Sequence, residues 1–477
     1  MHLTLRGVKM VIHQLVDIDE LVQLGRERAR KTDHPIIVSQ VLPVPSLDPL
    51  SFYVAGRSLF QGKRFYWSSP NQGQVLVGLG SALEIEGEKE SRFYDIHLHW
   101  TQLKEYTILG SDMKASGTGP LLLGGFSFVD QVNDPLWKEF KPASFTLPQL
   151  LLSKKGSQTF LTINLYLDPQ KREEPLPFYS QKWCHQFIEN VQKISWKPKH
   201  GGELSYEADD QAEWKRRVNE AIKTIKENQL RKVVLARRLE VSTSNPIEPE
   251  TVLANLVEMQ KGSYIFAIEK NDHSFMGASP EQLVRKEGEV VLSSCLAGSI
   301  PRGKTVEEDQ ALSKILLGDQ KNRHEHQVVV QMIKEALQHF CQHVTVVQEP
   351  IILKTAQIQH LYTPVKGKIK PSVSLLNLVQ ALHPTPALGG YPQEKAVNYI
   401  KTYEPFERGW YASPIGWLDH HNNGEFIVGI RSGLIKGRKA YLYAGCGIVE
   451  DSDPLAEYEE TNIKFKPMLS ALGGQFL

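Results

Sequence analysis

The chain has 477 residues and an ordinary globular composition, with 41% hydrophobic and 23% charged residues. Its formal net charge is +1, so no overall field attracts nucleic acid or an acidic membrane surface. No stretch reaches the roughly 20 apolar residues that a membrane span requires, and the N-terminal segment lacks the apolar core of a signal peptide. The four cysteines are far apart and form no CxxC pair, which favours reduced thiols. These features predict a cytoplasmic protein that binds neither nucleic acid nor membranes.

Short strand-like runs alternate with polar loops in the N-terminal part, at 35–42, 64–68, 74–79 and 160–167. A helical pattern from about residue 88 to residue 109 interrupts this series. A GLGSAL run at 78–83 lacks the third glycine of a dinucleotide-binding fingerprint, so it predicts a turn and supports a nicotinamide oxidoreductase only weakly. The segment KPKHGG at 197–202 marks a boundary, because Pro and Gly interrupt regular structure. We therefore predict an N-terminal α/β region over residues 1–200.

The second region, residues 205–477, begins with an amphipathic helix that Asp210 caps. A strand at 231–241 follows, and further strands are expected at 264–268, 290–296, 426–435 and 440–449. Helices are expected at 324–340 and 454–472, the second with Asp453 as its cap and Pro454 at its first position. The strands lack the regular βαβ alternation of a parallel sheet. The pattern predicts an α+β fold in which helices flank large mixed or antiparallel sheets, with the first region packed on the second.

Two strands near the C-terminus carry glycines in their interiors. Alternation in the segment EFIVGIRSGLI places Gly429, Arg431 and Gly433 on one face, and Gly445 and Gly447 share a face in the next strand. Glycine inside a strand often marks a place where a ligand approaches the backbone. Four glycines around one arginine indicate a cavity whose cation binds a carboxylate or phosphate. A barrel bend with a surface arginine explains the same pattern equally well.

Acidic residues in the two C-terminal helices form a second candidate site. Glu325 heads an apolar helix stripe, and a buried carboxylate requires a cation or a metal as its partner. Glu457, Glu460 and Lys464 share one face of the last helix. Carboxylates from two helices, completed by water, suit the octahedral oxygen coordination of Mg²⁺. An ordinary surface pair of Glu460 with Lys464 is the simpler explanation from spacing alone.

Eight motifs follow one another along the second region. They are KVVLAR at 232–237, GASPEQL at 277–283, CLAGSIPRG at 295–303, RHEH at 323–326, LHPTPALGGYP at 382–392, GWYASPIGW at 409–417, GIRSGLI at 429–435 and AGCGIVEDSDPLAEYEET at 444–461. Together they resemble the chorismate-utilising enzymes, the family of isochorismate, salicylate, anthranilate and aminodeoxychorismate synthases. Eight co-linear motifs are more specific than any single one, and they outweigh the simpler explanations given above. The resemblance implies the chorismate-binding fold, and the long N-terminal region is similar to the menaquinone-pathway isochorismate synthases rather than to the shorter siderophore-pathway type.

The resemblance also implies a mechanism. Lys232 matches the base that activates water in isochorismate and salicylate synthases, a lysine that the ammonia-using anthranilate enzymes lack. No glutaminase subunit is therefore expected. Glu281 matches the acid that protonates the departing ring hydroxyl, which requires a carboxyl that stays protonated near neutrality in an apolar or like-charged surrounding. Glu325 and Glu460 match the ligands of Mg²⁺, and Glu457 is expected to act through water.

The remaining matched positions line the pocket for chorismate. Arg431, Tyr411 and the backbone near Gly445 match the contacts to its enolpyruvyl carboxylate, and further pocket positions fall on Lys464, His360 and Ser299. The implied activity is Mg²⁺-dependent isochorismate synthesis, an isomerisation in which water adds to one ring carbon and hydroxyl leaves from another. The alternatives are a salicylate synthase, which also eliminates pyruvate, and a siderophore-pathway isochorismate synthase. A non-catalytic binding protein would need neither the lysine base nor the carboxylic acid.

Overall fold

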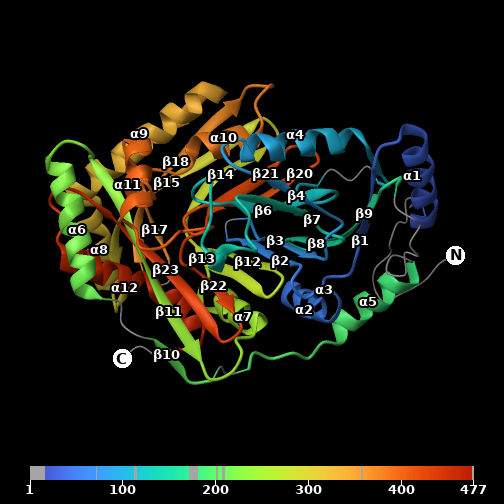
Figure 1. The fold of residues 1–477 in the computed structure, drawn as a ribbon, viewed down its shortest axis with the longest axis horizontal. Coiled ribbons are helices and arrows are strands. Elements are labelled where there is room, and N and C mark those ends of the chain that lie inside the picture. The colour runs from blue at the N-terminus through green and yellow to red at the C-terminus, as the bar shows by residue number, and fades with distance from the viewer. Residues whose placement is uncertain are drawn as a thin grey trace.

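Two large β-sheets, packed against each other and flanked by helices, form the core of the computed structural model (Figure 1). The structure describes residues 17–70, 72–111, 115–170, 181–199, 202–206, 210–355 and 358–474. Residues 1–16 of the N-terminal segment and residues 200 and 201 of the predicted boundary lie outside these ranges. Among the described residues, no helix is both long enough and apolar enough to cross a membrane.

The first sheet has 13 strands and the second has 10, and the pairs are antiparallel apart from the parallel pair of β1 with β5. The first sheet runs in the order β10 (Leu204–Tyr206), β11 (Lys232–Thr243), β23 (Lys439–Ile448), β22 (Ser432–Lys436), β13 (His273–Ser279), β12 (Tyr264–Lys270), β2 (Arg64–Ser69), β3 (Gln74–Leu79), β8 (Leu150–Lys155), β9 (Gln158–Leu167), β1 (Ile36–Pro43) and β5 (Thr107–Leu109), with β19 (Gly390–Tyr391) beside β11. The second runs in the order β16 (Cys341–Val346), β18 (Ile358–Ile369), β15 (Val290–Pro301), β14 (Gln282–Glu287), β21 (Gly424–Val428), β20 (Pro414–Asp419), β6 (Leu121–Phe126), β7 (Ala143–Leu147) and β4 (Leu83–Gly87), with β17 (Ile351–Lys354) beside β18.

Helices gather at both ends and along the edges of the sheets. In Figure 1, α6, α8, α11 and α12 lie at one end of the molecule, and α1 and α5 lie at the other. Helix α9 packs on β15, β16 and β18 of the second sheet. The helices are α1 (Ile18–Thr32), α2 (Pro49–Ala55), α3 (Arg57–Phe60), α4 (Arg92–Glu105), α5 (Gln181–Lys193), α6 (Gln211–Lys226), α7 (Pro249–Met259), α8 (Val306–Gly318), α9 (Gln320–Phe340), α10 (Leu375–Leu382), α11 (Gln393–Tyr403) and α12 (Pro454–Ala471).

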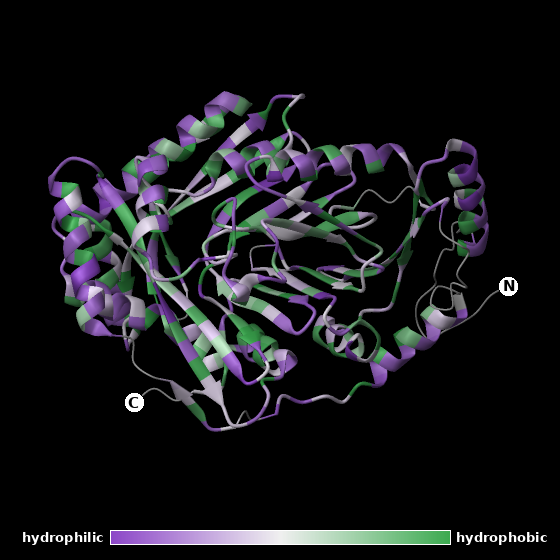
Figure 2. Cartoon of the chain, viewed as in Figure 1, coloured by the Kyte–Doolittle hydropathy of each residue, from purple (hydrophilic) through white to green (hydrophobic). Residues whose placement is uncertain are grey.

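The first sheet is covered by apolar side chains on both faces. In β12, Phe266 and Ile268 belong to the core that the two sheets share, whereas Ile265 and Ala267 belong to a second core. Because side chains alternate along a strand, the two cores lie on opposite faces of this sheet. The second core also contains residues of α1, α2, α5, α7 and α12, so these helices cover the outer face. Figure 2 shows the same arrangement, with hydrophobic strands in the interior and mixed polar and apolar helices outside.

The predicted fold class is confirmed, and so are most of the predicted elements. Asp210 caps α6, and Asp453 caps α12 with Pro454 at its start. The strands β3, β9, β12 and β15 lie where the sequence places them. The helical pattern expected over 88–109 is shorter, because α4 ends at Glu105 and the chain continues as β5. All four cysteines are buried and unpaired, as expected for reduced thiols.

The N-terminal and C-terminal regions are joined by hydrogen-bonded strand pairs in both sheets. In the first sheet β2 pairs with β12, with Trp67 opposite Phe266. In the second sheet β6 pairs with β20, with Gly124 opposite Gly416. The N-terminal region therefore contributes strands to the same two sheets that carry the C-terminal motifs. The division near residue 200 stays a prediction.

Candidate active site

Two passages of the chain from one sheet to the other lie side by side and bring Glu281 next to Arg431. The first passage runs from β13 through Glu281 to β14, and the second runs from β21 through Arg431 to β22. The backbone N–H of Val428 donates to the carbonyl of Glu281 at 3.1 Å, and that of Ala278 donates to the carbonyl of Arg431 at 3.1 Å. The sequence does not predict this double passage, which places an acid and a cation where the sheets separate.

The segment around Arg431 is not the single strand expected over 426–435. It forms two strands in different sheets, and Arg431 between them has a φ of 50°. A positive φ is uncommon for a residue with a side chain, so the surrounding structure holds this conformation. The prediction that alternation continues through Arg431 is therefore wrong, because the chain changes sheets at this point. The guanidinium nevertheless loses hydration through burial, and this loss lowers the pKa of Arg431.

The carboxyl of Glu281 is almost fully buried, at 6% exposure. Burial raises its pKa to about 7, although Arg431, Lys232 and Lys464 act in the opposite direction. The loss of hydration therefore outweighs the attraction of three cations. The apolar surrounding expected for Glu281 is present, whereas no like charge contributes. At neutral pH this carboxyl exists in both protonation states, so it can give up or accept a proton.

Lys232 starts β11 and extends toward helix α9. Its ammonium pairs with the carboxylate of Glu325, and only 12% of the lysine side chain is exposed. The next strand makes room for it, because a Cβ atom at Gly447 would lie 2.7 Å from Cε of Lys232. A side chain at position 447 would therefore displace the end of the lysine from this position. The Glu325 side chain is 33% exposed, so the buried carboxylate that the helix pattern predicts is not found, although the residue does have the lysine as a partner.

The carboxylates of α12 lie near the same lysine. Glu460 pairs with Lys464 at 2.5 Å, and this pair holds the pKa of Glu460 below its usual range, with further lowering by Arg431 and Lys232. Burial raises the pKa of Glu457, and the charge of Glu460 acts in the same direction. Glu457 accepts a hydrogen bond from Ser452 at 2.8 Å. Lys232 therefore lies near carboxylates of both helices, because it pairs with Glu325 of α9 and contributes to the lowered pKa of Glu460 of α12.

The fit of these carboxylates to Mg²⁺ rests on their chemistry. All three donors are carboxylate oxygens, which a hard divalent cation prefers. Within the described residues, a group of three or more possible ligand atoms within 4.8 Å of one another occurs only at Glu139, Asp272 and His273. The three predicted ligands are therefore not drawn together by the protein alone, and their role stays a prediction.

Tyr411 and Lys464 both approach Gly445 of β23. The ammonium of Lys464 donates to the carbonyl of Gly445 at 2.8 Å, and a Cβ atom at Gly445 would lie 3.1 Å from the hydroxyl of Tyr411. The Tyr411 ring is buried and stacks on Tyr443. The glycines expected to surround Arg431 have other neighbours, since a Cβ atom at Gly429 would meet Ile415 and one at Gly433 would meet Leu442.

Ser299 and His360 lie opposite each other on β15 and β18. The hydroxyl of Ser299 is 2.7 Å from Nδ1 of His360. Burial lowers the pKa of His360 to about 3, with Arg431 and Lys464 acting in the same direction, so the imidazole is neutral at physiological pH. Its Nε2 atom is buried and has no hydrogen-bond partner among the residues that the structure describes. The pair therefore presents one free polar atom beside two cations.

A buried ion pair that the sequence analysis does not identify supports β11. Arg408 and Glu404 pair at 2.5 Å, and both side chains are almost fully buried. Arg408 donates to the carbonyl of Val234 at 2.7 Å, and Glu404 accepts from the N–H of Ala236 at 2.8 Å. These bonds fix the strand two to four residues after Lys232. The spacing of four residues, directly after α11, is the only signal in the sequence, and it is common on protein surfaces.

The sequence matches the family described as chorismate binding enzyme over residues 23–473. The chain belongs to the chorismate-binding enzymes. It is 41% identical over 459 residues to isochorismate synthase MenF of Bacillus subtilis, covering 94% of this chain and 96% of that protein. It is 34% identical over 452 residues to the salicylate biosynthesis isochorismate synthase of Pseudomonas aeruginosa, covering 94% and 93%. The resemblance seen in the eight motifs is confirmed.

A solved structure of this family has the same fold. The menaquinone-specific isochorismate synthase MenF of Escherichia coli superposes with a TM-score of 0.74 at 26% identity, covering 94% of this chain and 99% of that chain. The match includes the strands before residue 200. The N-terminal region of this chorismate-binding enzyme is therefore part of a fold that a solved relative shares over nearly its whole length.

Proposed function

We propose that the protein is an isochorismate synthase that converts chorismate to isochorismate for menaquinone biosynthesis in the cytoplasm. The observation that carries the proposal is that a possible proton donor, the carboxyl of Glu281, lies near a possible base, the amine of Lys232. Glu281 has a pKa of about 7 because it is buried, and the amine of Lys232 is close enough to act on that pKa. The relative from Bacillus subtilis, named isochorismate synthase MenF, supports the same activity over almost the full chain.

In the proposed reaction, Lys232 removes a proton from water as the water attacks one ring carbon. Glu281 donates its proton to the hydroxyl that leaves from another carbon of the conjugated system. A proton donor with a pKa near 7 is suited to this step, because it is still partly protonated at neutral pH. The buried surroundings of both groups limit competing reactions with bulk water. Because the nucleophile is water, the enzyme is expected to need no glutaminase subunit.

The carboxylates of Glu325 and Glu460 would hold Mg²⁺, with Glu457 acting through water. When bound, the ion would neutralise the ring carboxylate of chorismate and draw electron density from the ring. The amine of Lys232 contacts Glu325, and Lys464 pairs with Glu460. Lys232 acts as the base in its neutral form. Lys464 holds the pKa of Glu460 below its usual range, so this carboxyl is in the ionised form that binds a hard cation.

A second group of side chains, separate from the proposed Mg²⁺ ligands, would bind the enolpyruvyl carboxylate of chorismate. Arg431 offers a planar, delocalised cation, and Tyr411 with the backbone at Gly445 lies beside it. Lys464 holds the carbonyl of Gly445, while Ser299 and His360 approach from the second sheet. The pocket therefore has cationic and anionic sides, which matches a dicarboxylate that also binds a metal ion.

Arg431→Ala is expected to weaken chorismate binding by roughly 2–5 kcal/mol, because a buried charge-assisted contact would be lost. Calorimetric titration with chorismate measures this directly. Arg438→Ala, which removes an exposed arginine from the turn between β22 and β23, is the matched control and should bind like the wild type. Normal binding by Arg431→Ala would mean that the carboxylate is bound elsewhere.

Product analysis tests the proposed function. The purified protein is incubated with chorismate and Mg²⁺, and the products are separated by chromatography while pyruvate is measured in a coupled assay. We expect isochorismate as the main product, little pyruvate, no turnover in excess EDTA and recovery when Mg²⁺ is restored. Pyruvate release equal to chorismate loss would instead identify a salicylate synthase. Full turnover in EDTA would remove the metal from the proposal.

A further inference from the structure

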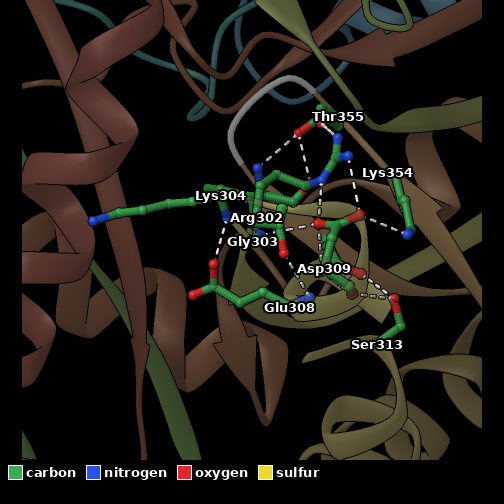
Figure 3. Close-up of polar contacts among 11 residues, drawn as sticks. Arg302, Gly303, Lys304, Glu308, Asp309, Ser313, Lys354 and Thr355 are labelled. Atoms are coloured by element: carbon green, nitrogen blue, oxygen red, sulfur yellow. Dashed lines mark hydrogen bonds and ion pairs between the residues drawn. The ribbon is translucent and has the colours of Figure 1, made fainter. Parts of the chain in front are cut away.

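Asp309 lies at the centre of a polar network outside the pocket (Figure 3). It is in the first turn of α8, and its carboxylate is almost fully buried. The donors to this carboxylate are Nε and Nη2 of Arg302 at 2.7 and 3.1 Å, Nζ of Lys354 at 2.7 Å, the N–H of Gly303 at 3.0 Å and Nε2 of Gln359 at 3.0 Å. Two of these donors are cations, and Arg302 and Lys354 hold the pKa of Asp309 well below its usual range.

The network ties together the ends of three strands. Arg302 and Gly303 follow β15, Lys354 ends β17, and Gln359 lies at the start of β18. Arg302 also donates to the carbonyl of Thr355 at 2.6 Å, and Ser313 of α8 donates to Gln359 at 2.5 Å. One carboxylate thus connects the chain leaving β15 with the chain entering β18.

These strand ends carry two pocket residues. In the pairing of β15 with β18, Ser299 lies opposite His360, and Ile300 lies opposite Gln359. Because side chains alternate, Gln359 points to the face opposite His360, so the network and the pocket lie on different faces of the same strands. The pairing of β15 with β18 is irregular between Leu296 and Ser299, so regular backbone pairing does not hold β15 just before Ser299. The side-chain bonds of the Asp309 network hold the chain just after Ser299.

We propose that Asp309 is a positioning residue that fixes Ser299 and His360, and with them the free Nε2 atom of His360, against the substrate. The proposal rests on the proposed function, since it takes these two residues to line the chorismate pocket. Without the carboxylate, Arg302 and Lys354 would lose the anion between them, and the chain after β15 would lose its side-chain connection to Lys354 and Gln359. The imidazole is buried, neutral and bonded to Ser299, so its position follows the two strands.

Asp309→Asn keeps the size of the side chain but removes its charge and places an amide N–H against cationic donors. The expected result is an increase of about 10-fold in the KM for chorismate and in its calorimetric Kd, with a much smaller change in kcat. Lys354→Met removes a single donor from a half-exposed position, and we expect a smaller change in the same direction. Glu307→Gln, on an exposed position of the same helix turn, is the matched control and should behave as wild type.

A double-mutant cycle separates positioning from general destabilisation. If Asp309 acts through His360, the KM and Kd of Asp309→Asn combined with His360→Ala should equal those of His360→Ala alone. Effects that multiply, or wild-type KM and Kd in both Asp309→Asn and Lys354→Met, would overturn the proposal. Wild-type protein that binds chorismate but makes no isochorismate would sink the proposed function alone, because the Kd values of the cycle still test Asp309.

Discussion

Glu281→Gln should lower kcat by roughly 10²–10⁴-fold and, at the same time, make the protein more stable at pH 8. The first effect follows from the loss of a proton donor, since an amide cannot protonate a leaving hydroxyl. The second follows from burial, which raises the pKa of this carboxyl from 4.5 to about 7. Ionisation of a buried acid with a raised pKa lowers the free energy of unfolding.

The direction of the stability change follows from the two pKa values. Below pH 4.5 the carboxyl is protonated in the folded and unfolded chains, so the glutamate contributes no pH-dependent cost. As the pH rises toward 7 the unfolded chain ionises first, which stabilises the unfolded chain. The cost approaches about 3 kcal/mol above pH 7, at roughly 1.4 kcal/mol for each pKa unit. Urea unfolding of Glu281→Gln should therefore show a gain at pH 8 and no gain at pH 4.

The same carboxyl predicts the alkaline side of the activity profile. The wild-type kcat should fall as the pH rises above about 7, because Glu281 loses the proton that it must donate. Glu287→Gln, an exposed position at the end of β14, is the control for both measurements. A Glu281→Gln protein with near wild-type kcat would remove the carboxyl from the proposed acid role, whatever its stability.

Lys232→Ala should lower kcat by at least about 10²-fold while chorismate and Mg²⁺ still bind. The amine is proposed to activate water, and the loss of a general base has this magnitude. Binding should survive because the proposed carboxylate contacts are made by Arg431 and Tyr411. Steady-state kinetics with calorimetric Kd values for both ligands measures the two parts separately. Lys223→Ala, on the exposed side of α6, is the control.

The contact of Lys232 with Glu325 offers a different explanation for a loss of activity. Removal of the lysine leaves Glu325 without its ion pair, and the Mg²⁺ affinity of the variant can then change. A titration with Mg²⁺ distinguishes the two roles. A base defect persists at saturating Mg²⁺, whereas a defect restored by Mg²⁺ would show that Lys232 only balances the charge of Glu325.

Local patterns in the sequence predict elements well where the cause is local. Asp210 and Asp453 accept hydrogen bonds from the first backbone N–H groups of α6 and α12, as their positions indicate. Alternate residues of β12 point into the two cores, as strand alternation predicts. Glu460 and Lys464, which the spacing places on one face of the last helix, form an ion pair. Each of these features depends on residues within a few positions of one another.

Features that depend on long-range packing cannot be predicted in this way. The passage at Arg431 has hydrophobic residues on both sides, so the segment reads as one strand, although its halves belong to different sheets. The Glu404–Arg408 pair has the spacing of a surface pair but is buried by its contacts with β11. The neighbours of Glu281 come from three distant segments, and only the folded chain brings these cations together.

The candidate site is predicted mainly through the family motifs. Spacing alone leaves Glu460 and Lys464 as an ordinary pair and Lys232 as a solvated strand end. The structure places Lys232 against Glu325 and beside Glu281, which the motifs imply and the spacing does not. The Asp309 network lies in the CLAGSIPRG motif and the helix after it, where no local pattern distinguishes a positioning acid from a first-turn acid.

The origin of the new hydroxyl tests the central claim, that the enzyme adds water to chorismate to form isochorismate. Chorismate is converted in water enriched in ¹⁸O with Mg²⁺ present, and the product is analysed by mass spectrometry after a single turnover. The proposed mechanism predicts isochorismate with one solvent-derived oxygen at its ring hydroxyl. Unlabelled isochorismate, in which the original hydroxyl has moved within the substrate, would contradict it.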